Sequence, residues 1–315
     1  MWVTEMRRSD NDNSSRQLMK ALGRYAKPSN IHGMFRVGIN WLSIIAAWVT
    51  IENVNLGTPT GNYLISAGLA IFISVQMSGL EACVHEASHY TLFRTRTLND
   101  RLHLLYAIPI LVCIKRYRQV HRIHHRELGE STDPVVQLYS DTGVIDFPDH
   151  FFWVMFFRPL VGYHTVLFMK EFLVSSAKGR AFAFFSFIYI FSFMSLCGIF
   201  GVWRIAVFGF IVPLFYILPM LLFWTEVLDH AGLDWRRQFN ASRNNLGPAN
   251  GIIFYPHGEG YHLIHHLHPG IPAHQLAAAY RDVITADLLP AGTTCFSLGE
   301  SVEAVRANRA RRDFK

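Results

Sequence analysis

Charged residues are scarce in this 315-residue sequence. Asp, Glu, Lys and Arg make up 17% of the chain, whereas hydrophobic residues make up 51%; ordinary soluble domains carry roughly 25% charged residues. This shortage argues against water as the solvent for much of the chain and favours lipid. The net charge is +6 at pH 7, but the basic residues flank apolar runs. We therefore expect them to mark a cytoplasmic membrane face, and we expect no nucleic-acid partner.

Paired cysteines are also missing. The chain has four Cys, and no two of them form a C-x-x-C pair, so the sequence indicates neither a disulfide framework nor a thiolate zinc site. Residues 1–33 contain no apolar stretch of the kind that signal peptides carry, so no cleavable signal peptide is expected. The four residues are Cys83, Cys113, Cys197 and Cys295.

Long apolar runs are what the sequence has instead. Four of them cover residues 37–51, 63–84, 181–202 and 205–228. Each is about long enough to cross a hydrocarbon core of ~30 Å, although the first is marginal. The fourth contains two prolines, which membrane helices tolerate and which usually kink them. The predicted fold is therefore all-α and integral to a membrane, with four transmembrane helices.

Two weaker runs, 102–114 and 151–169, are too short or too interrupted to cross a bilayer. We expect both to form interfacial amphipathic helices. The aromatic-rich stretch 182–193 could line a substrate path, but a lipid-facing helix is the favoured interpretation.

The distribution of Lys and Arg predicts the orientation. Residues 1–36 carry seven of them, residues 85–180 carry twelve and the part after His230 carries nine, whereas the connection between the first two runs carries none. Positive residues concentrate on the cytosolic side of a membrane. Both termini are therefore expected in the cytosol, together with a histidine-rich cap.

We divide the chain into three parts by composition. Residues 1–33 form a polar N-terminal tail with room for one amphipathic helix, residues 34–290 form the membrane domain, and residues 291–315 form a basic C-terminal tail.

Three histidine clusters stand out among the 16 His residues. The first is an H-x3-H and the other two are H-x2-H-H. Positions i, i+3 and i+4 share one face of a helix, so each cluster presents its imidazoles in one direction, as polydentate metal binding requires. The clusters are His85 and His89; His121, His124 and His125; and His262, His265 and His266.

The predicted topology brings these clusters to one place. The second apolar run extended to His89 makes a helix of ~40 Å at 1.5 Å per residue, which exceeds the ~30 Å core. The first cluster should project past the cytosolic face, where the other two also lie. His230, at the cytosolic end of the fourth crossing, is a ninth candidate.

Acidic residues accompany two of these histidines. Glu81 lies four residues before His85, and Glu226 lies four residues before His230. A carboxylate that accepts the second N–H of a ligand imidazole is a common arrangement, so both are candidates for it; they could equally mark helix ends.

So many imidazoles exceed what one ion can hold, and two ions are expected. Imidazole suits Zn, Cu, Fe and Ni. A catalytic zinc site needs only three protein ligands, so redox chemistry with O2 is the better fit, although spacing alone leaves the metal open. Four of the remaining histidines are expected to be surface or interfacial residues: His32, His103, His150 and His164. Three others lie near the third cluster and are expected to have no role in the site: His257, His268 and His274.

The clusters and their surroundings resemble the membrane fatty acid desaturase and hydroxylase superfamily. The matching segments are His85-Glu-Ala-Ser-His89 with Leu98-Asn-Asp100, His121-Arg-Ile-His-His125 with Asp133-Pro134, Tyr261-His-Leu-Ile-His-His-Leu-His-Pro269, and Asp229-His230-Ala-Gly232. The last has Asp where the superfamily usually has Glu. The first cluster is H-x3-H, unlike the H-x4-H of acyl-CoA Δ9 desaturases, and the third begins with His262, unlike the Gln of front-end desaturases.

The resemblance implies two non-haem irons. Their ligands would be the eight histidines of the three clusters together with His230. It also implies reduction of O2 with external electrons and removal of hydrogen from an unactivated carbon. Asp229 joins Glu81 and Glu226 as a candidate partner of a ligand imidazole. With no fused cytochrome b5 domain in the sequence, electrons are expected from a separate ferredoxin or cytochrome b5 with its reductase.

Desaturation of a fatty-acyl or lipid-like chain is the favoured function. Hydroxylation or ketolation of an alkane, sphingolipid or carotenoid is an alternative, as is desaturation of a small amphiphilic, amino-acid-derived metabolite. Outside the oxygenases, a membrane zinc hydrolase or a metal-binding protein stays open. A transporter is disfavoured, because the apolar runs lack His, Asp and Lys at mid-depth. Gly258-Glu259-Gly260 is expected to be a plain turn; the alternative is that its glycines allow a close backbone approach at the site.

Overall fold

A computed structural model of the chain describes residues 12–144, 150–235, 239 and 241–307. Helices dominate this part of the chain, and its two strands, β1 (Asn244–Asn245) and β2 (Thr294–Cys295), form one short parallel pair. The predicted all-α class is confirmed.

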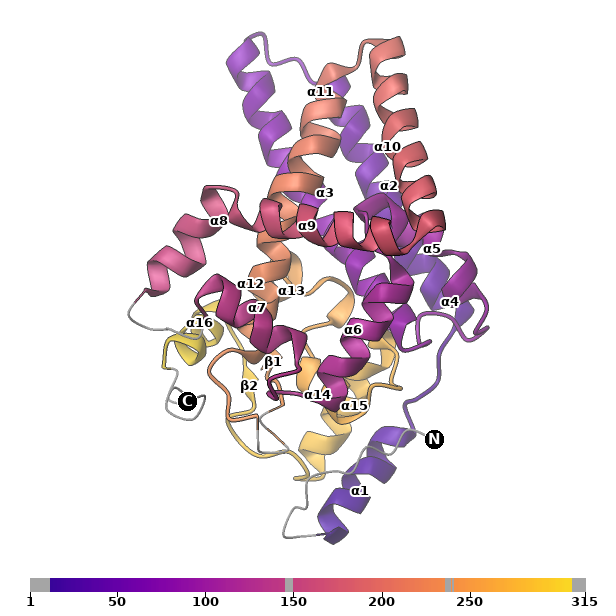
Figure 1. Cartoon of the computed structure of the whole chain (residues 1–315). Helices are drawn as coiled ribbons and strands as arrows, with labels where there is room; N and C mark the ends of the chain where they lie inside the picture. Colours follow the sequence, from indigo (N-terminus) through magenta and orange to yellow (C-terminus); the bar gives the residue numbers. More distant parts are fainter. Residues whose placement is uncertain (1–11, 145–149, 236–238, 240, 308–315) are drawn as a thin grey trace.

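Four helices are long and apolar enough to cross a membrane. They are α2 (Asn30–Asn53), α3 (Pro59–Ser88), α10 (Arg180–Phe200) and the continuous helical segment Trp203–His230. Figure 1 shows them projecting together to one side, away from the shorter helices. The four predicted crossings are confirmed, and two of the helices, α2 and α3, begin at least four residues before the apolar runs that predicted them.

The outer faces of these helices are apolar. Leu42, Ile71 and Phe191 expose 66%, 55% and 74% of their surface. Only 17% of the most apolar stretch of α10 is buried. Such exposed apolar surface matches lipid rather than water. The aromatic stretch on α10 is therefore mainly lipid-facing.

The fourth crossing is irregular where its prolines lie. It consists of α11 (Trp203–Ala206), the π-helical turns η4 (Val207–Ile211) and η5 (Pro213–Ile217), and α12 (Leu218–His230). Proline has no N–H and collides with the carbonyl four residues earlier, and widening the helix to π geometry relieves that collision. A neighbouring helix satisfies the carbonyl four residues before Pro213: Trp48 of α2 donates a hydrogen bond from Nε1 to the Gly209 carbonyl at 2.9 Å.

The two weaker apolar runs differ from each other. The run 102–114 is not one interfacial helix: it breaks into α5 (His103–Tyr106) and the 3-10 turn η1 (Ile108–Ile110), and its middle is buried in the core. The break is local, because Pro109 begins a new turn and Leu111 adopts a positive φ of 56°. In the second run, α9 (Tyr163–Lys178) lies across the ends of the long helices (Figure 1).

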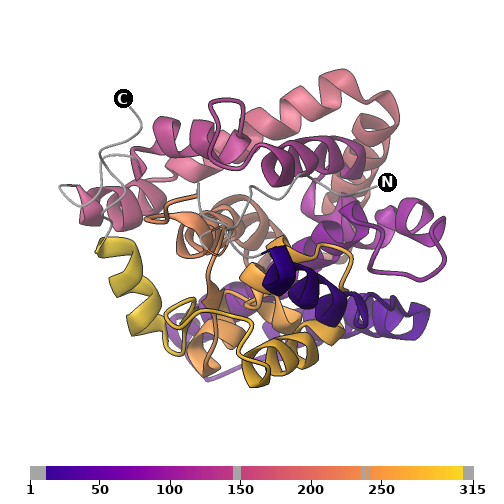
Figure 2. The ribbon, with the colours of Figure 1, turned by 90° about the horizontal axis from the view of Figure 1, so that it is seen from below.

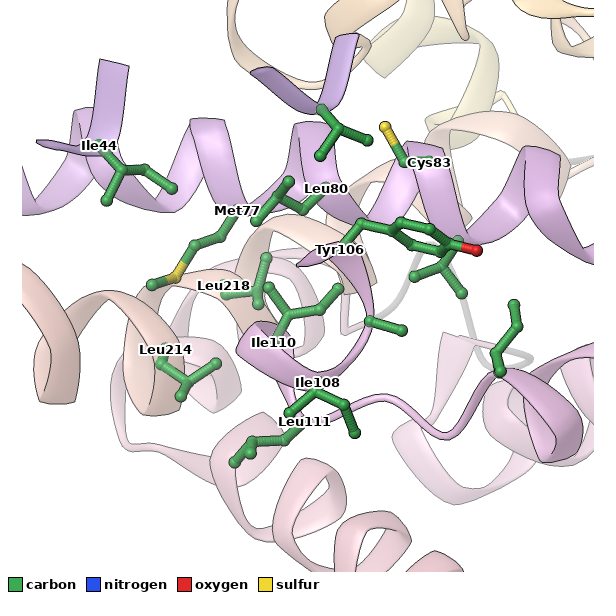
Figure 3. Close-up of a cluster of buried hydrophobic side chains, with 14 of the residues drawn as sticks. Ile44, Met77, Leu80, Cys83, Tyr106, Ile108, Ile110, Leu111, Leu214 and Leu218 are labelled. Atoms are coloured by element: carbon green, nitrogen blue, oxygen red, sulfur yellow. The ribbon is translucent and has the colours of Figure 1, made fainter. Parts of the chain in front are cut away.

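One hydrophobic core lies between three of the crossings and the 102–114 run. Figure 3 shows Ile44 of α2, Met77 and Leu80 of α3, and Leu218 of α12 around the η1 turn. This packing anchors the C-terminal part of α3 from several sides and so limits the movement of the side chains that follow it.

Most of the remaining helices form a cap on the other side of α9 from the crossings, whereas η3 and α8 lie beside α9 (Figure 1). Their bounds are α4 Leu98–Arg101, α6 Ile114–Arg126, α7 Pro134–Thr142, η3 Trp153–Phe157, α8 Arg158–Leu160, α13 Pro248–Ile253, η7 Pro256–Gly258, α14 His262–Leu267, α15 Ala273–Thr285 and α16 Leu298–Arg306. Figure 2 shows this cap from below, with α1 (Asp12–Gly23) lying against the C-terminal third of the chain.

Both terminal parts pack where they are described. Leu18 and Leu22 of α1 are buried against α14 and α15, and Val305 of α16 is buried beside α12. The amphipathic helix expected in the N-terminal tail is α1. The division at residues 33 and 290 stays a prediction.

Candidate metal centre

Eight histidines gather in two groups at the end of the crossings that meets the cap of shorter helices. Within each group the ring nitrogens that could bind an ion all lie within 4.8 Å of one another. The larger group contains His85, His89, His121, His125 and His265, and the smaller contains His124, His230 and His266. All three predicted clusters therefore meet.

The length of α3 places the first cluster. Thr58 caps its N-terminus, Pro59 begins it, and its 30 residues span ~45 Å, about 15 Å more than a hydrocarbon core. The helix ends at His89, where Tyr90 has a positive φ of 62°. Arg96 and Arg118 hold the Tyr90 ring from two sides, at 3.8 and 4.1 Å, which fixes the end of the helix.

Short helices place the other two clusters. His121, His124 and His125 lie on the last turns of α6, and the third cluster fills α14. Asn244 of β1 accepts hydrogen bonds from the first backbone N–H groups of α14, while Leu263 and Ile264 are buried on its other face. The helix is thereby held with its imidazoles turned toward the site.

A metal ion fits the larger group by the spacing of its nitrogens. The Nε2 atom of His265 lies 2.9 Å from that of His85 and 3.1 Å from that of His125, which in turn lies 3.0 Å from that of His121. Two metal–nitrogen bonds of roughly 2.0–2.1 Å at right angles separate their nitrogens by about 3 Å.

The smaller group shows the same fit through unpaired atoms. The Nε2 atoms of His124, His230 and His266 are buried, and within the described part of the chain none has a hydrogen-bond partner. The same holds for His89 in the larger group. Buried nitrogens that lack partners are costly, and an ion between them removes that cost.

The opposite ring nitrogens of three histidines are occupied by the protein. His85 Nδ1 lies 2.9 Å from Glu259 Oε2, His124 Nδ1 lies 3.0 Å from Asp133 Oδ1, and His230 Nδ1 lies 2.9 Å from the Ala241 carbonyl. Each contact leaves Nε2 facing its group, which is how proteins orient imidazole ligands.

The predicted acidic partners occupy other positions. Glu226 lies 3.8 Å from His230 on its Nε2 side, and Asp229 lies 3.9 Å from His262 Nε2. Glu81 faces Tyr117, while Glu259 takes the Nδ1 of His85. Glu226 therefore faces the same space as the unpaired nitrogens.

His262, the ninth predicted ligand, lies between the two groups but belongs to neither by this spacing. Its ring centroid is 4.8 Å from that of His266 and 5.5 Å from that of His265. Its Nε2 faces Asp229, which the Asn245 amide holds at 2.9 Å.

Burial keeps five histidines of α6 and α14 neutral. Burial first, and then neighbouring imidazoles, lower the pKa of His121, His125, His265 and His266 well below the usual value, and the same causes lower the pKa of His262 to about 3. Only neutral imidazole offers a lone pair to a metal, so these side chains are in the ligand form at neutral pH.

Among the remaining histidines, His164 was placed wrongly by the sequence. It is buried, and its ring stacks on Phe223 of α12 at 3.9 Å. An interfacial position had been expected, but α9 turns this face toward the fourth crossing. His32 is exposed and stacks on His274, and His257 contacts Asn40.

Several residues that shape the site were missed. Arg243 donates to the Leu228 and Ala231 carbonyls, and Asn245 donates to the Leu228 carbonyl, so both stabilise the end of α12 that carries His230. Asp133, noted only within the Asp-Pro pair, also caps α7 through Val135 N. For Arg243, Asn245 and Glu259 the sequence carried no signal beyond their proximity to the clusters.

Comparison with known proteins agrees with the site. Residues 61–299 match the fatty acid desaturase family, a span that includes all three histidine clusters. Dihydrorhizobitoxine desaturase of Bradyrhizobium elkanii is similar, with 25% identity over 294 residues that cover 86% of this chain and 80% of that protein. The resemblance predicted from the histidine motifs is confirmed. This chain belongs to the fatty acid desaturase family and is an integral membrane oxidoreductase of the desaturase type.

Proposed function

We propose that the chain uses two irons, held by its histidines, to introduce a double bond into a fatty-acyl or other lipid-like substrate. The observation that carries this proposal is the meeting of eight histidines in two adjacent groups at the end of four apolar helices. The proposed ligands are those eight together with His262.

The ligand set suits a redox metal pair. Neutral imidazoles accept Zn, Cu, Fe or Ni, and nine of them exceed what hydrolytic zinc needs. When bound, an iron pair would activate O2 for hydrogen abstraction, which acid–base chemistry cannot achieve at an alkyl carbon. The protein's part is to hold the imidazoles in place, through Glu259, Asp133 and the Ala241 carbonyl.

The overall reaction balances with an external donor. Two adjacent carbons each lose one hydrogen and a C=C bond forms; O2 takes up these two hydrogens, two further electrons and two protons, and leaves as two waters. The two electrons come from a separate ferredoxin, or from cytochrome b5 with its reductase. Oxygen rebound to the first carbon would give an alcohol instead, so substrate placement decides the product.

The membrane supplies the substrate in this proposal. The histidine groups lie at the end of the crossings, so a chain entering from the bilayer reaches them along the helices. The excess of Lys and Arg on the same side supports a cytosolic location for the cap and both termini, where soluble electron donors are found.

A second substrate candidate comes from the relative's name. It names dihydrorhizobitoxine as the compound desaturated, so a small molecule of that kind is the alternative to an acyl chain. Hydroxylation or ketolation of an alkane, sphingolipid or carotenoid, and a zinc hydrolase, are further outcomes of the same test.

The test is purification in detergent, metal quantification, and turnover with reductant, O2 and both substrate classes. We expect about two irons per chain and a product that has lost two hydrogens. A product that has gained one oxygen indicates a hydroxylase, and zinc without iron overturns the proposal.

A further inference from the structure

A buried ionic network connects α2 to the larger histidine group. Arg36 of α2 contacts Glu86 of α3, and its other guanidinium nitrogen lies 3.2 Å from Glu259 Oε1. The three residues are 5%, 5% and 9% exposed. The network is therefore fully enclosed, and its charges act at short range with little screening.

The network does not balance its own charge. One guanidinium faces two carboxylates, which leaves one negative charge. Glu86 directs its other oxygen away from the site, to the backbone N–H of Ala273 at the start of α15. Glu259 directs its other oxygen to His85 Nδ1, at 2.9 Å. The uncompensated charge therefore faces His85.

The backbone around Glu259 is built for this approach. Gly258 has a φ of +85°, which favours glycine. A Cβ on Gly260 would lie 2.3 Å from the Asn245 carbonyl oxygen. With glycine on both sides, the turn brings Glu259 under the end of α3, 174 residues away from His85 in sequence. A turn at the surface would leave this carboxylate in water, whereas Glu259 is buried.

We propose that Glu259, held by Arg36, is a positioning residue for the His85 metal subsite. It keeps the proton of His85 on Nδ1, so that Nε2 is free for the metal, and its charge makes the imidazole a stronger donor. This inference rests on the proposed function, because it takes the larger group to hold one ion of the pair. Partners of this type change metal affinity by about 10–100-fold.

Glu259→Gln tests the role, because it keeps the size of the side chain and removes its charge. The purified full-length chain is stripped with a chelator in detergent and titrated anaerobically with Fe2+, and separately with Co2+ monitored by absorbance. Wild type should bind two ions. The variant should bind one with wild-type affinity and one about 10–100-fold more weakly, with an altered Co2+ spectrum for the weak ion.

Glu86→Gln is the matched control, since Glu86 is also buried and its side chain contacts Arg36 and the Ala273 N–H, whereas His85 Nδ1 contacts Glu259. This variant should lower the thermal unfolding midpoint, because it weakens the start of α15. The affinities for the two metal ions should stay as in wild type. A merely structural role for Glu259 predicts that both variants behave alike.

Glu259→Asp keeps the negative charge but moves it one methylene farther from His85, and should also lower the affinity for one of the two ions. Wild-type affinity for both ions in the Gln and Asp variants would overturn the inference, and if the Gln variant does not fold, the Asp variant decides by the same criterion. If the wild-type chain itself binds no metal, the proposed function fails instead, so the two failures are distinguishable.

Discussion

At the scale of single residues, the imidazoles differ in the partners that their two ring nitrogens contact. His124 lies in the smaller group, with Nδ1 against Asp133 and Nε2 unpaired. His265 lies in the larger group, with Nε2 beside those of His85 and His125. Each ring therefore offers one nitrogen to its group, and neither could be replaced by a side chain without such a nitrogen.

Replacing either histidine with alanine should abolish turnover and lower the bound metal, while the protein stays in the membrane, because the four crossings do not depend on it. The measurements are product formation, metal per chain, and the amount of protein in washed membranes. His103→Ala is the control, since this half-buried ring hydrogen-bonds the nearby Asp100 carbonyl and belongs to neither histidine group. Full activity in either variant would contradict the ligand assignment.

His164 carries a pH dependence that follows from its burial. Burial, and then the Arg158 charge, lower the pKa of His164 to about 4, below its ordinary value of roughly 6.5. The unfolded chain thus binds more protons at this residue between these two values, so its contribution to stability is complete above pH 6.5 and declines as the pH falls toward 4. At pH 5 the loss is about 2 kcal/mol.

Lowering the pH from 7.5 to 5 should therefore reduce the thermal unfolding midpoint of His164→Phe by less than it reduces that of wild type. The reason is that Phe keeps the stacking on Phe223 without a titrating group. Unfolding in detergent at the two pH values measures this. The exposed His150→Phe should behave as wild type, and an equal loss in all three proteins would show that His164 does not titrate as inferred.

At the scale of helices, α1 supports the third histidine cluster from outside the membrane. Leu18 and Leu22 are 1% and 0% exposed, and they share a core with Leu263 and Ile264 of α14. α14 has only six residues, too few for a stable helix by itself. Its geometry therefore depends on the surfaces around it, α1 among them.

Leu22→Ala should destabilise the chain by about 2–5 kcal/mol, the usual cost of removing a buried leucine, and should speed the loss of metal to a chelator. Thermal unfolding and the rate of metal extraction measure the two effects. Lys20→Ala, on the exposed face of the same helix, should change neither. If the Leu22→Ala chain loses metal at the wild-type rate, α1 does not support the metal site.

At the scale of the whole molecule, the proposed orientation puts the cap in the cytosol and the connection after α2 on the other side. Asn55 in that connection and Glu303 on α16 are both exposed, and the native cysteines are buried or half-buried. In intact cells, an impermeant maleimide should label Asn55→Cys, and should reach Glu303→Cys only after permeabilisation. The wild-type chain measures background labelling. The reverse pattern would invert the topology.

The sequence by itself determined the elements whose signals lie within one helix. The four crossings follow from runs of apolar residues, and the convergence of the clusters follows from the i, i+3, i+4 spacing together with the length of α3. Both are local properties, because one helix face or one bilayer thickness decides them. The same local reasoning failed for 102–114, where packing among the crossings outweighed the pattern.

Only the tertiary structure decided what supports each imidazole. Spacing of four residues suggested Glu81 for His85, yet the partner is Glu259, 174 residues away, because a bent turn brings that carboxylate beneath α3. Likewise Arg243 meets the end of α12 only after the chain has turned back on itself. Hydrogen bonds depend on distances of a few tenths of an ångström, and between distant segments those distances exist only once the helices have packed.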